Sequence, residues 1–135
     1  MNANVRNWVA LVARIALALI FITSGWSKLT HFSGAEAYMA SAGVPMIQPL
    51  LVLTIIIELG GGLLLALGWK ARWAALAFAI WIVPVSLVFH AFWSAAPEQA
   101  QMQYIQFMKN VSIFGGMLMV IAFGPGAFAL ERDKS

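Results

Sequence analysis

The chain has 135 residues, of which 62% are hydrophobic and only 10% are charged, and its formal net charge is +3. So few charges cannot cover the surface of a small water-soluble domain, and so apolar a chain is not disordered. The absence of cysteine excludes disulfides, iron–sulfur clusters and cysteine-ligated zinc, and the modest, scattered positive charge argues against nucleic acid as a partner. The composition therefore indicates a membrane protein.

Four apolar stretches approach the ~20 residues that a helix needs to cross the hydrocarbon core. They cover about residues 8–28, 46–67, 73–93 and 105–123. None alternates with the period of two that a barrel strand requires. Arg14 interrupts the first stretch and no Ala-x-Ala site follows, so we expect a retained helix and not a cleaved signal. The sequence predicts a single all-α domain over residues 1–135, a four-transmembrane-helix bundle.

The connections between these stretches differ in length and in character. Ala35, Tyr38, Met39 and Ala42 have helical spacing, so the first long connection, 31–45, can form a short interfacial helix. The connection 68–72 is a tight turn, and 94–104 carries Glu98 and three glutamines, so we expect a solvated loop there.

Lysine and arginine counts predict the orientation of the bundle. Four spans place both termini and the 68–72 turn on one side of the membrane. That side holds five basic residues, Arg6, Lys70, Arg72, Arg132 and Lys134. We therefore expect a multi-pass protein of the bacterial inner membrane with both termini in the cytoplasm.

Five ionisable residues lie within or at the edge of the predicted spans: Arg14, Lys28, Glu58, His90 and Lys109. A charge at the bilayer centre costs about 2.5–3.5 kcal/mol on insertion scales, so such groups are expected to pair or to face a wet cavity. Counting residues from the span ends puts Arg14 and Glu58 at similar depth, which predicts a structural ion pair. The other three lie about one turn from the outer interface and are expected to form an outer polar layer.

From their helical spacing, we predict that these groups face the inside of the bundle. Arg14, Ala18, Phe21, Gly25 and Lys28 share one face, and Lys109, Ser112 and Gly116 share another. Each group also has a purely structural explanation: a packing clamp for Arg14–Glu58, a snorkelling Lys28, a satisfied core His90. With two histidines and no carboxylate cluster, neither a metal nor haem is expected, and we predict no catalytic residues.

Several ordered motifs give the chain a family likeness. They are Arg14 with Phe21-Ile22-x-Ser24-Gly25-x-x-Lys28-Leu29, Gly43-x-Pro45, Glu58-x-x-Gly61-Gly62, Leu67-Gly68 with Arg72, Phe89-His90-x-Phe92-Trp93, Gln106-Phe107-x-Lys109-Asn110 and Gly115-Gly116. The chain resembles the DoxX family of small four-helix bacterial membrane proteins over nearly its full length. The resemblance implies a distant relation to DoxD-type subunits of thiosulfate:quinone oxidoreductases and to Surf4 cargo receptors.

The leading functional hypothesis is an accessory membrane subunit, not an enzyme on its own, that supports a redox or stress-related complex. A polar pocket open to the periplasm would bind a quinone or another small hydrophobic ligand. Its candidate residues are Glu58, His90, Trp93, Lys109 and Asn110. A histidine and a lysine can hydrogen-bond quinone carbonyls while aromatic side chains line the ring.

Two other classes stay open. A small transporter or proton-coupled exchanger would use Glu58 and His90 as its titrating groups. A scaffold or receptor would recruit a membrane or periplasmic protein through its outer loops. The glycine-rich helices also allow a homo-oligomer.

Overall fold

The computed structural model describes residues 1–131, and this part of the chain is mostly helical and contains no strand. The elements in chain order are α1 (Ala3–Thr30), α2 (Phe32–Ser41), α3 (Ile47–Ile55), the π-helix η1 (Ile56–Gly61), α4 (Gly62–Leu67), α5 (Ala71–Phe89), the 3₁₀ turn η2 (Phe92–Ser94) and α6 (Pro97–Phe123). Four helical stretches are long and apolar enough to cross a membrane: Ala3–Thr30, Ile47–Leu67, Ala71–Ser94 and Pro97–Phe123. The predicted all-α four-helix membrane fold is confirmed.

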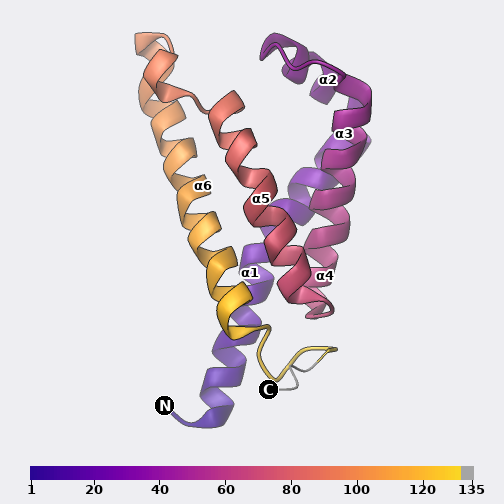
Figure 1. The fold of residues 1–135 in the computed structure, drawn as a ribbon, viewed down its shortest axis with the longest axis vertical. Helices are drawn as coiled ribbons and strands as arrows, with labels where there is room; N and C mark the ends of the chain where they lie inside the picture. Colours follow the sequence, from indigo (N-terminus) through magenta and orange to yellow (C-terminus); the bar gives the residue numbers. More distant parts are fainter. Residues whose placement is uncertain (132–135) are drawn as a thin grey trace.

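The four long helices run alternately up and down (Figure 1). The start of α1 and the segment after α6 lie at one end, which we call the terminal end. Helix α2 and the connection from α5 to α6 lie at the other end, which we call the loop end. There α2 and the start of α3 diverge from α5 and α6, whereas the helices converge toward the terminal end (Figure 1).

The predictions for the two long connections had different outcomes. The 31–45 connection does contain a helix, α2, which ends before Gly43, a glycine with a φ of +73°. The predicted solvated loop 94–104 is mostly wrong, because α6 already begins at Pro97. Proline suits the first turn of a helix, and the polar first turns of α6 extend the helix beyond its apolar stretch. Hydropathy alone marks where a helix meets lipid and does not mark where the helix begins.

Small residues set the packing of α1 against the antiparallel η1 and α4. A Cβ added at Gly25 would lie 3.0 Å from both the Glu58 Cβ and the Leu59 backbone nitrogen, and one at Gly62 would lie 2.8 Å from Ile22 Cγ1. Such positions let two helix backbones approach closely where the surrounding lipid provides no hydrophobic drive for association. The register that results places the last third of α1, around Gly25, beside η1.

The larger of two buried clusters lies between α1, α4, α5 and α6. Phe78 of α5 is fully buried, and its ring stacks on Phe21 of α1 with 4.0 Å between the ring centroids. Gly61 makes room for the same Phe78 ring, since a Cβ there would meet its Cζ at 3.0 Å. Most of the remaining large apolar side chains are exposed on the outside of the bundle, as expected for helices that face acyl chains.

The segment after α6 folds back over the terminal end. Leu130 and Glu131 donate backbone hydrogen bonds to the Leu67 and Gly68 carbonyls, at 3.1 Å each. The Glu131 carboxylate pairs with the Lys70 ammonium at 2.9 Å. This segment lacks helical hydrogen bonds of its own, so it depends on such partners to satisfy its backbone.

Candidate functional site

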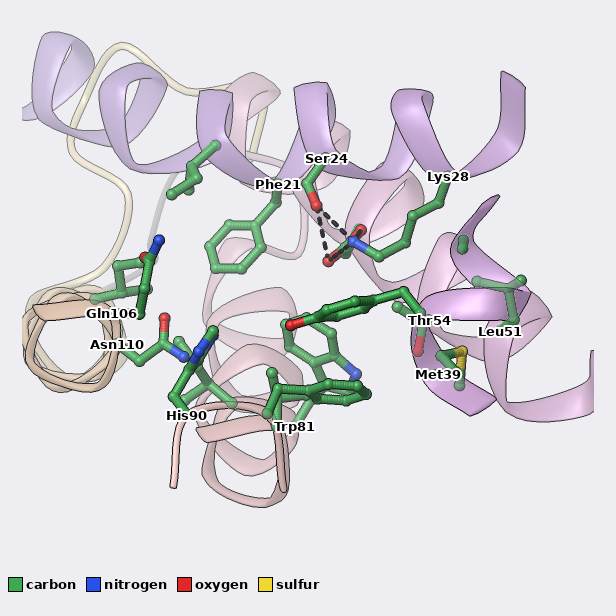
Figure 2. A pocket seen from close by; sticks show the side chains of 18 residues that line it. Phe21, Ser24, Lys28, Met39, Leu51, Thr54, Trp81, His90, Gln106 and Asn110 are labelled. Atoms are coloured by element: carbon green, nitrogen blue, oxygen red, sulfur yellow. Dashed lines mark hydrogen bonds and ion pairs between the residues drawn. The ribbon is translucent and has the colours of Figure 1, made fainter. Parts of the chain in front are cut away.

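A cavity of about 320 Å³ lies inside the bundle toward the loop end (Figure 2). Every long helical stretch and α2 contribute to its wall. The polar lining residues are Ser24, Lys28, Tyr38, Thr54, Glu58, His90, Gln106 and Asn110, and the larger apolar ones include Phe21, Met39, Leu51, Trp81, Ile82 and Phe89. The cavity is therefore an apolar chamber with a limited number of hydrogen-bonding groups, the usual make-up of a small-molecule site.

An ion pair forms one side of the cavity. The Lys28 ammonium lies 3.0 Å from Glu58 Oε2 and 3.1 Å from Oε1, and it also donates to Ser24 Oγ at 2.6 Å. Ser24 Oγ in turn donates to Glu58 Oε1 at 3.3 Å. Glu58 is only 3% exposed, whereas the Lys28 side chain is 30% exposed. The carboxylate is thus satisfied from one helix, α1, and the ammonium remains partly accessible.

Local backbone features deliver Glu58 to this position. Glu58 lies in η1, a single π-helical turn between α3 and α4. A π-turn places an extra residue in the helix and shifts the side chains around it, and such turns frequently occur at functional sites. Gly25 allows α1 to approach this turn, and Ser24 and Lys28 lie one helical turn apart on the same face of α1.

A second polar group lies across the cavity. His90 caps the end of α5, and its Nδ1 lies 2.8 Å from Gln103 Oε1. Asn110 Nδ2 donates to Ser86 Oγ at 2.9 Å. Figure 2 shows His90, Gln106 and Asn110 on the side opposite Ser24 and Lys28. The cavity therefore offers two separate polar groups to one occupant.

Aromatic rings line the cavity between the two polar groups and at the loop end. Phe21 and Trp81 meet edge to face with 6.1 Å between their ring centroids. At the loop end the Tyr38 ring of α2 stacks on Phe89 of α5, with 5.3 Å between centroids and 17° between planes. A planar conjugated ligand matches such walls, because flat π-faces stack or meet edge to face.

The predicted Arg14–Glu58 ion pair is wrong. Arg14 is 3% exposed, and its guanidinium donates to the Ala66 carbonyl at 3.2 Å, the Phe128 carbonyl at 2.7 Å and the Pro125 carbonyl. Arg14 thus stabilises the terminal end, including the segment after α6. Ala66 follows Glu58 by eight residues, which corresponds to about 12 Å along a helix. The prediction compared depths counted from the ends of the apolar stretches. It was wrong because α1 extends beyond its apolar stretch, which shifts the register between α1 and the helical stretch that carries Glu58.

The predicted outer polar layer of Lys28, His90 and Lys109 does not form. Lys28 pairs with Glu58, His90 pairs with Gln103, and Lys109 is exposed on the outside of α6. The inward face of α6 runs instead through Asn110, Ile113 and Met117. Because adjacent residues of a helix differ by about 100° in direction, an error of one position turned Lys109 and Ser112 outward, whereas Gly116 of the predicted face does lie against Leu17 of α1.

Of the five predicted pocket residues, Glu58, His90 and Asn110 line the cavity and two do not. Lys109 faces away, and Trp93 is 58% exposed and packs against Phe92 and Phe107. The prediction missed Ser24, Tyr38 and Gln106 as lining residues. Ser24 could have been found from its position four residues before Lys28, whereas Tyr38 enters only because α2 folds over the cavity.

The comparisons with known proteins place the chain in a family. The sequence model of the DoxX family matches residues 9–91. The chain is 38% identical to the inner membrane protein YqjF of Escherichia coli and 36% identical to its inner membrane protein YphA, over 90% of this chain in both cases and 88% and 87% of those proteins. It is also 25% identical to the Surfeit locus protein 4 homolog of Drosophila melanogaster, over 96% of this chain and 42% of that protein.

No solved structure matches the chain. The inner-membrane relatives and the four apolar helical stretches agree with a multi-pass inner-membrane protein. The DoxX match covers more than half of the chain, and the two Escherichia coli relatives are covered over most of their length. The chain therefore belongs to the DoxX family.

Proposed function

We propose that this protein is an accessory subunit of a membrane redox complex and that its cavity binds a quinone. The observation that carries the proposal is an aromatic-walled cavity of about 320 Å³ with polar groups on two opposite sides. A quinone is a planar ring with carbonyl acceptors at two opposite positions. The partly exposed Lys28 ammonium, whose N–H groups donate to Ser24 and Glu58, can turn one of them toward one carbonyl, and the Gln106 or Asn110 amide can donate to the other.

The side chains that line the cavity are better suited to binding a ligand than to catalysing a reaction. Glu58 is held by Lys28 and Ser24, and His90 by Gln103, so these side chains are oriented by the protein before a ligand arrives. Preorganised polar groups lower the cost of binding, because little side-chain freedom is lost. A redox partner would supply or accept the electrons, and this chain would hold the quinone near it.

Fluorescence of Trp81 tests quinone binding. Trp81 lines the cavity, whereas Trp8, Trp26, Trp69, Trp73 and Trp93 are exposed on the outside of the bundle. Titration of the detergent-solubilised protein with the ubiquinone head group lacking its side chain is expected to quench part of the emission in a saturable way. The saturable part should disappear in Trp81→Phe and persist in Trp73→Phe. Absence of saturable quenching, or equal quenching in Trp81→Phe, would contradict the proposal.

A second candidate is proton-coupled exchange through the same cavity. Its supporting observation is the acidic side chain of Glu58 in the cavity wall, within hydrogen-bond distance of a partly exposed lysine. Proteoliposomes with an imposed pH gradient and an entrapped pH-sensitive dye test it. Proton flux above that of empty liposomes, lost in Glu58→Gln and kept in Glu98→Gln, would favour exchange. Flux no greater than in empty liposomes would exclude it.

We also propose that both termini face the cytoplasm and that the cavity opens toward the periplasm. The start of α1 and the 68–72 turn share the terminal end, where Arg6, Lys70 and Arg72 lie. Arg132 and Lys134, which the prediction also counted, lie outside the described residues. Because the chain has no cysteine, single cysteines at Asn4 and Ser94 can be labelled in intact cells. An impermeant maleimide should label Ser94→Cys and spare Asn4→Cys; the reverse would invert the topology.

A further inference from the structure

A second, smaller cavity lies between the two helices that carry His90 and Asn110. Its volume is about 160 Å³, and we call it the α5–α6 crevice. Its wall is formed by Val83 and Leu87 of α5 and by Phe107, Val111 and Phe114 of α6, with Ser86 and Asn110 as the polar members. The crevice is therefore suited to a hydrocarbon chain and poorly suited to a polar group.

The crevice opens toward the outside of the bundle. Val83, Leu87 and Val111 are 47%, 52% and 45% exposed. They lie within helical stretches long and apolar enough to cross a membrane, so this outside is the acyl-chain region of the bilayer. A chain lying in the crevice could continue into the bilayer without crossing a polar surface.

The crevice adjoins the main cavity directly. Ile82 and Asn110 line both spaces. Between the two helices, Asn110 Nδ2 donates to Ser86 Oγ, and within α5 the Ser86 Oγ donates to the Ile82 carbonyl at 2.7 Å. The separation is thus formed by side chains, and rotation of the Asn110 amide would alter it without moving a helix.

The other neighbour of the main cavity has the opposite character. A groove of about 770 Å³ at the loop end shares Tyr38 and Phe89 with the cavity. Its lining includes Ser41, Glu98, Gln99 and Gln103, so water would occupy it. A hydrocarbon chain in this groove would be exposed to water, which is unfavourable. A hydrocarbon chain in the α5–α6 crevice would be shielded from water.

We propose that the ligand of the cavity is an amphiphile whose head lies in the cavity and whose hydrocarbon chain leaves through the α5–α6 crevice into the bilayer. This inference rests on the proposed function and extends it from the ring to the chain. An isoprenoid quinone and a membrane phospholipid both carry such a chain. The proposal is the shared chemistry, a polar head that carries at least one long apolar chain, and the test separates these two sources.

The test compares two quinones on two matched variants. Val111→Phe fills the crevice, and Leu118→Phe adds the same ring at another lipid-facing position of α6 that does not line it. Each protein is titrated with the ubiquinone head group alone and with decylubiquinone, by Trp81 quenching in the same detergent. Because each variant is compared with wild type for the same quinone, partitioning of that quinone into micelles cancels.

We expect a loss of binding that affects only decylubiquinone. Val111→Phe should weaken decylubiquinone binding about tenfold or more, because the displaced chain must find a worse environment, and should leave the head group alone unaffected. Leu118→Phe should affect neither quinone. Equal binding of decylubiquinone to Val111→Phe and wild type would overturn the crevice as the exit and leave the proposed quinone site standing. Failure of both quinones to bind wild type would overturn both proposals together.

Adding phospholipid to the same titrations separates the two sources of the chain. If a quinone chain occupies the crevice, phospholipid at excess should leave the decylubiquinone affinity of wild type within about twofold. If phospholipid instead abolishes the difference between wild type and Val111→Phe, a phospholipid tail is the occupant, which supports the shared chemistry and assigns it to lipid.

Discussion

Lys28 and Glu58, thirty residues apart in the sequence, form an ion pair with 3.0 Å between Nζ and Oε2 inside the bundle. The pair joins α1 to the π-turn η1 and lines the cavity at the same time. A paired carboxylate and ammonium avoid most of the cost that either charge alone would incur in lipid. The pair therefore holds two helices in register and presents an ordered polar group to the cavity.

A double-mutant cycle on this pair should show strong coupling. Lys28→Met and Glu58→Gln are each expected to destabilise the protein, Lys28→Met by about 3–5 kcal/mol because it leaves a buried charge unpaired. The double variant should lose clearly less than the sum of the single losses. Unfolding in mild detergent followed by circular dichroism measures these differences. The control cycle, Arg14→Gln with Glu58→Gln, should be additive; coupling there as strong as for Lys28 would contradict the observed pairing.

Arg14 should be required for the position of the segment after α6. Its planar guanidinium donates to three carbonyls in different directions, which a lysine ammonium at the same position cannot reproduce. In a background with the single cysteine Ala129→Cys, Arg14→Lys is expected to speed maleimide labelling by about tenfold, the equivalent of one lost charge-assisted hydrogen bond. Arg6→Lys, at an exposed position, is the control. Unchanged labelling in Arg14→Lys would show that the segment is held by other contacts.

Gly25 should not tolerate even alanine. The added methyl group would lie 2.8 Å from Leu59 Cγ and 3.0 Å from the Leu59 backbone nitrogen, so α1 and η1 would have to separate. We expect a loss of about 1–3 kcal/mol of unfolding free energy, typical of overpacking. Gly115→Ala in α6 is the matched control, because nothing lies within 4 Å of its added Cβ. That variant should be neutral or stabilising by up to about 1 kcal/mol; equal effects at both positions would argue against close packing at Gly25.

Asn110 and its neighbour Lys109 should differ in their effect on quinone binding. Asn110 lines the cavity, whereas Lys109 is exposed on the outside of α6. Asn110→Ala is expected to weaken binding of the ubiquinone head group by about tenfold, the usual effect of one lost hydrogen bond. Lys109→Ala should leave the affinity unchanged. Trp81 quenching measures both, and a loss confined to Lys109→Ala would place the ligand on the other face of α6.

The candidate site was predicted in part, and the errors have two causes. Asn110 entered the prediction with the family motif Gln106-Phe107-x-Lys109-Asn110, whereas Glu58 and His90 were identified because ionisable groups are costly in lipid, so their presence there was itself informative. Their partners were assigned wrongly, because the relative shift of two helices depends on close contacts such as Gly25 against Leu59. An error of one residue in helical direction likewise placed Lys109 in the cavity and missed the contribution of Gln106.

The sequence by itself determined that the chain has four helical stretches long and apolar enough to cross a membrane, as the described residues confirm. The scarcity of charge and the lengths of the apolar stretches suffice for that conclusion, because hydrocarbon admits little else than apolar helices. Only the tertiary structure decided which charges meet: Arg14 satisfies the carbonyls at the terminal end, and Glu58 pairs with Lys28 at the cavity. The physical reason is that each charge takes the partner within a few ångströms, and helix register sets that distance through packing between residues remote in sequence.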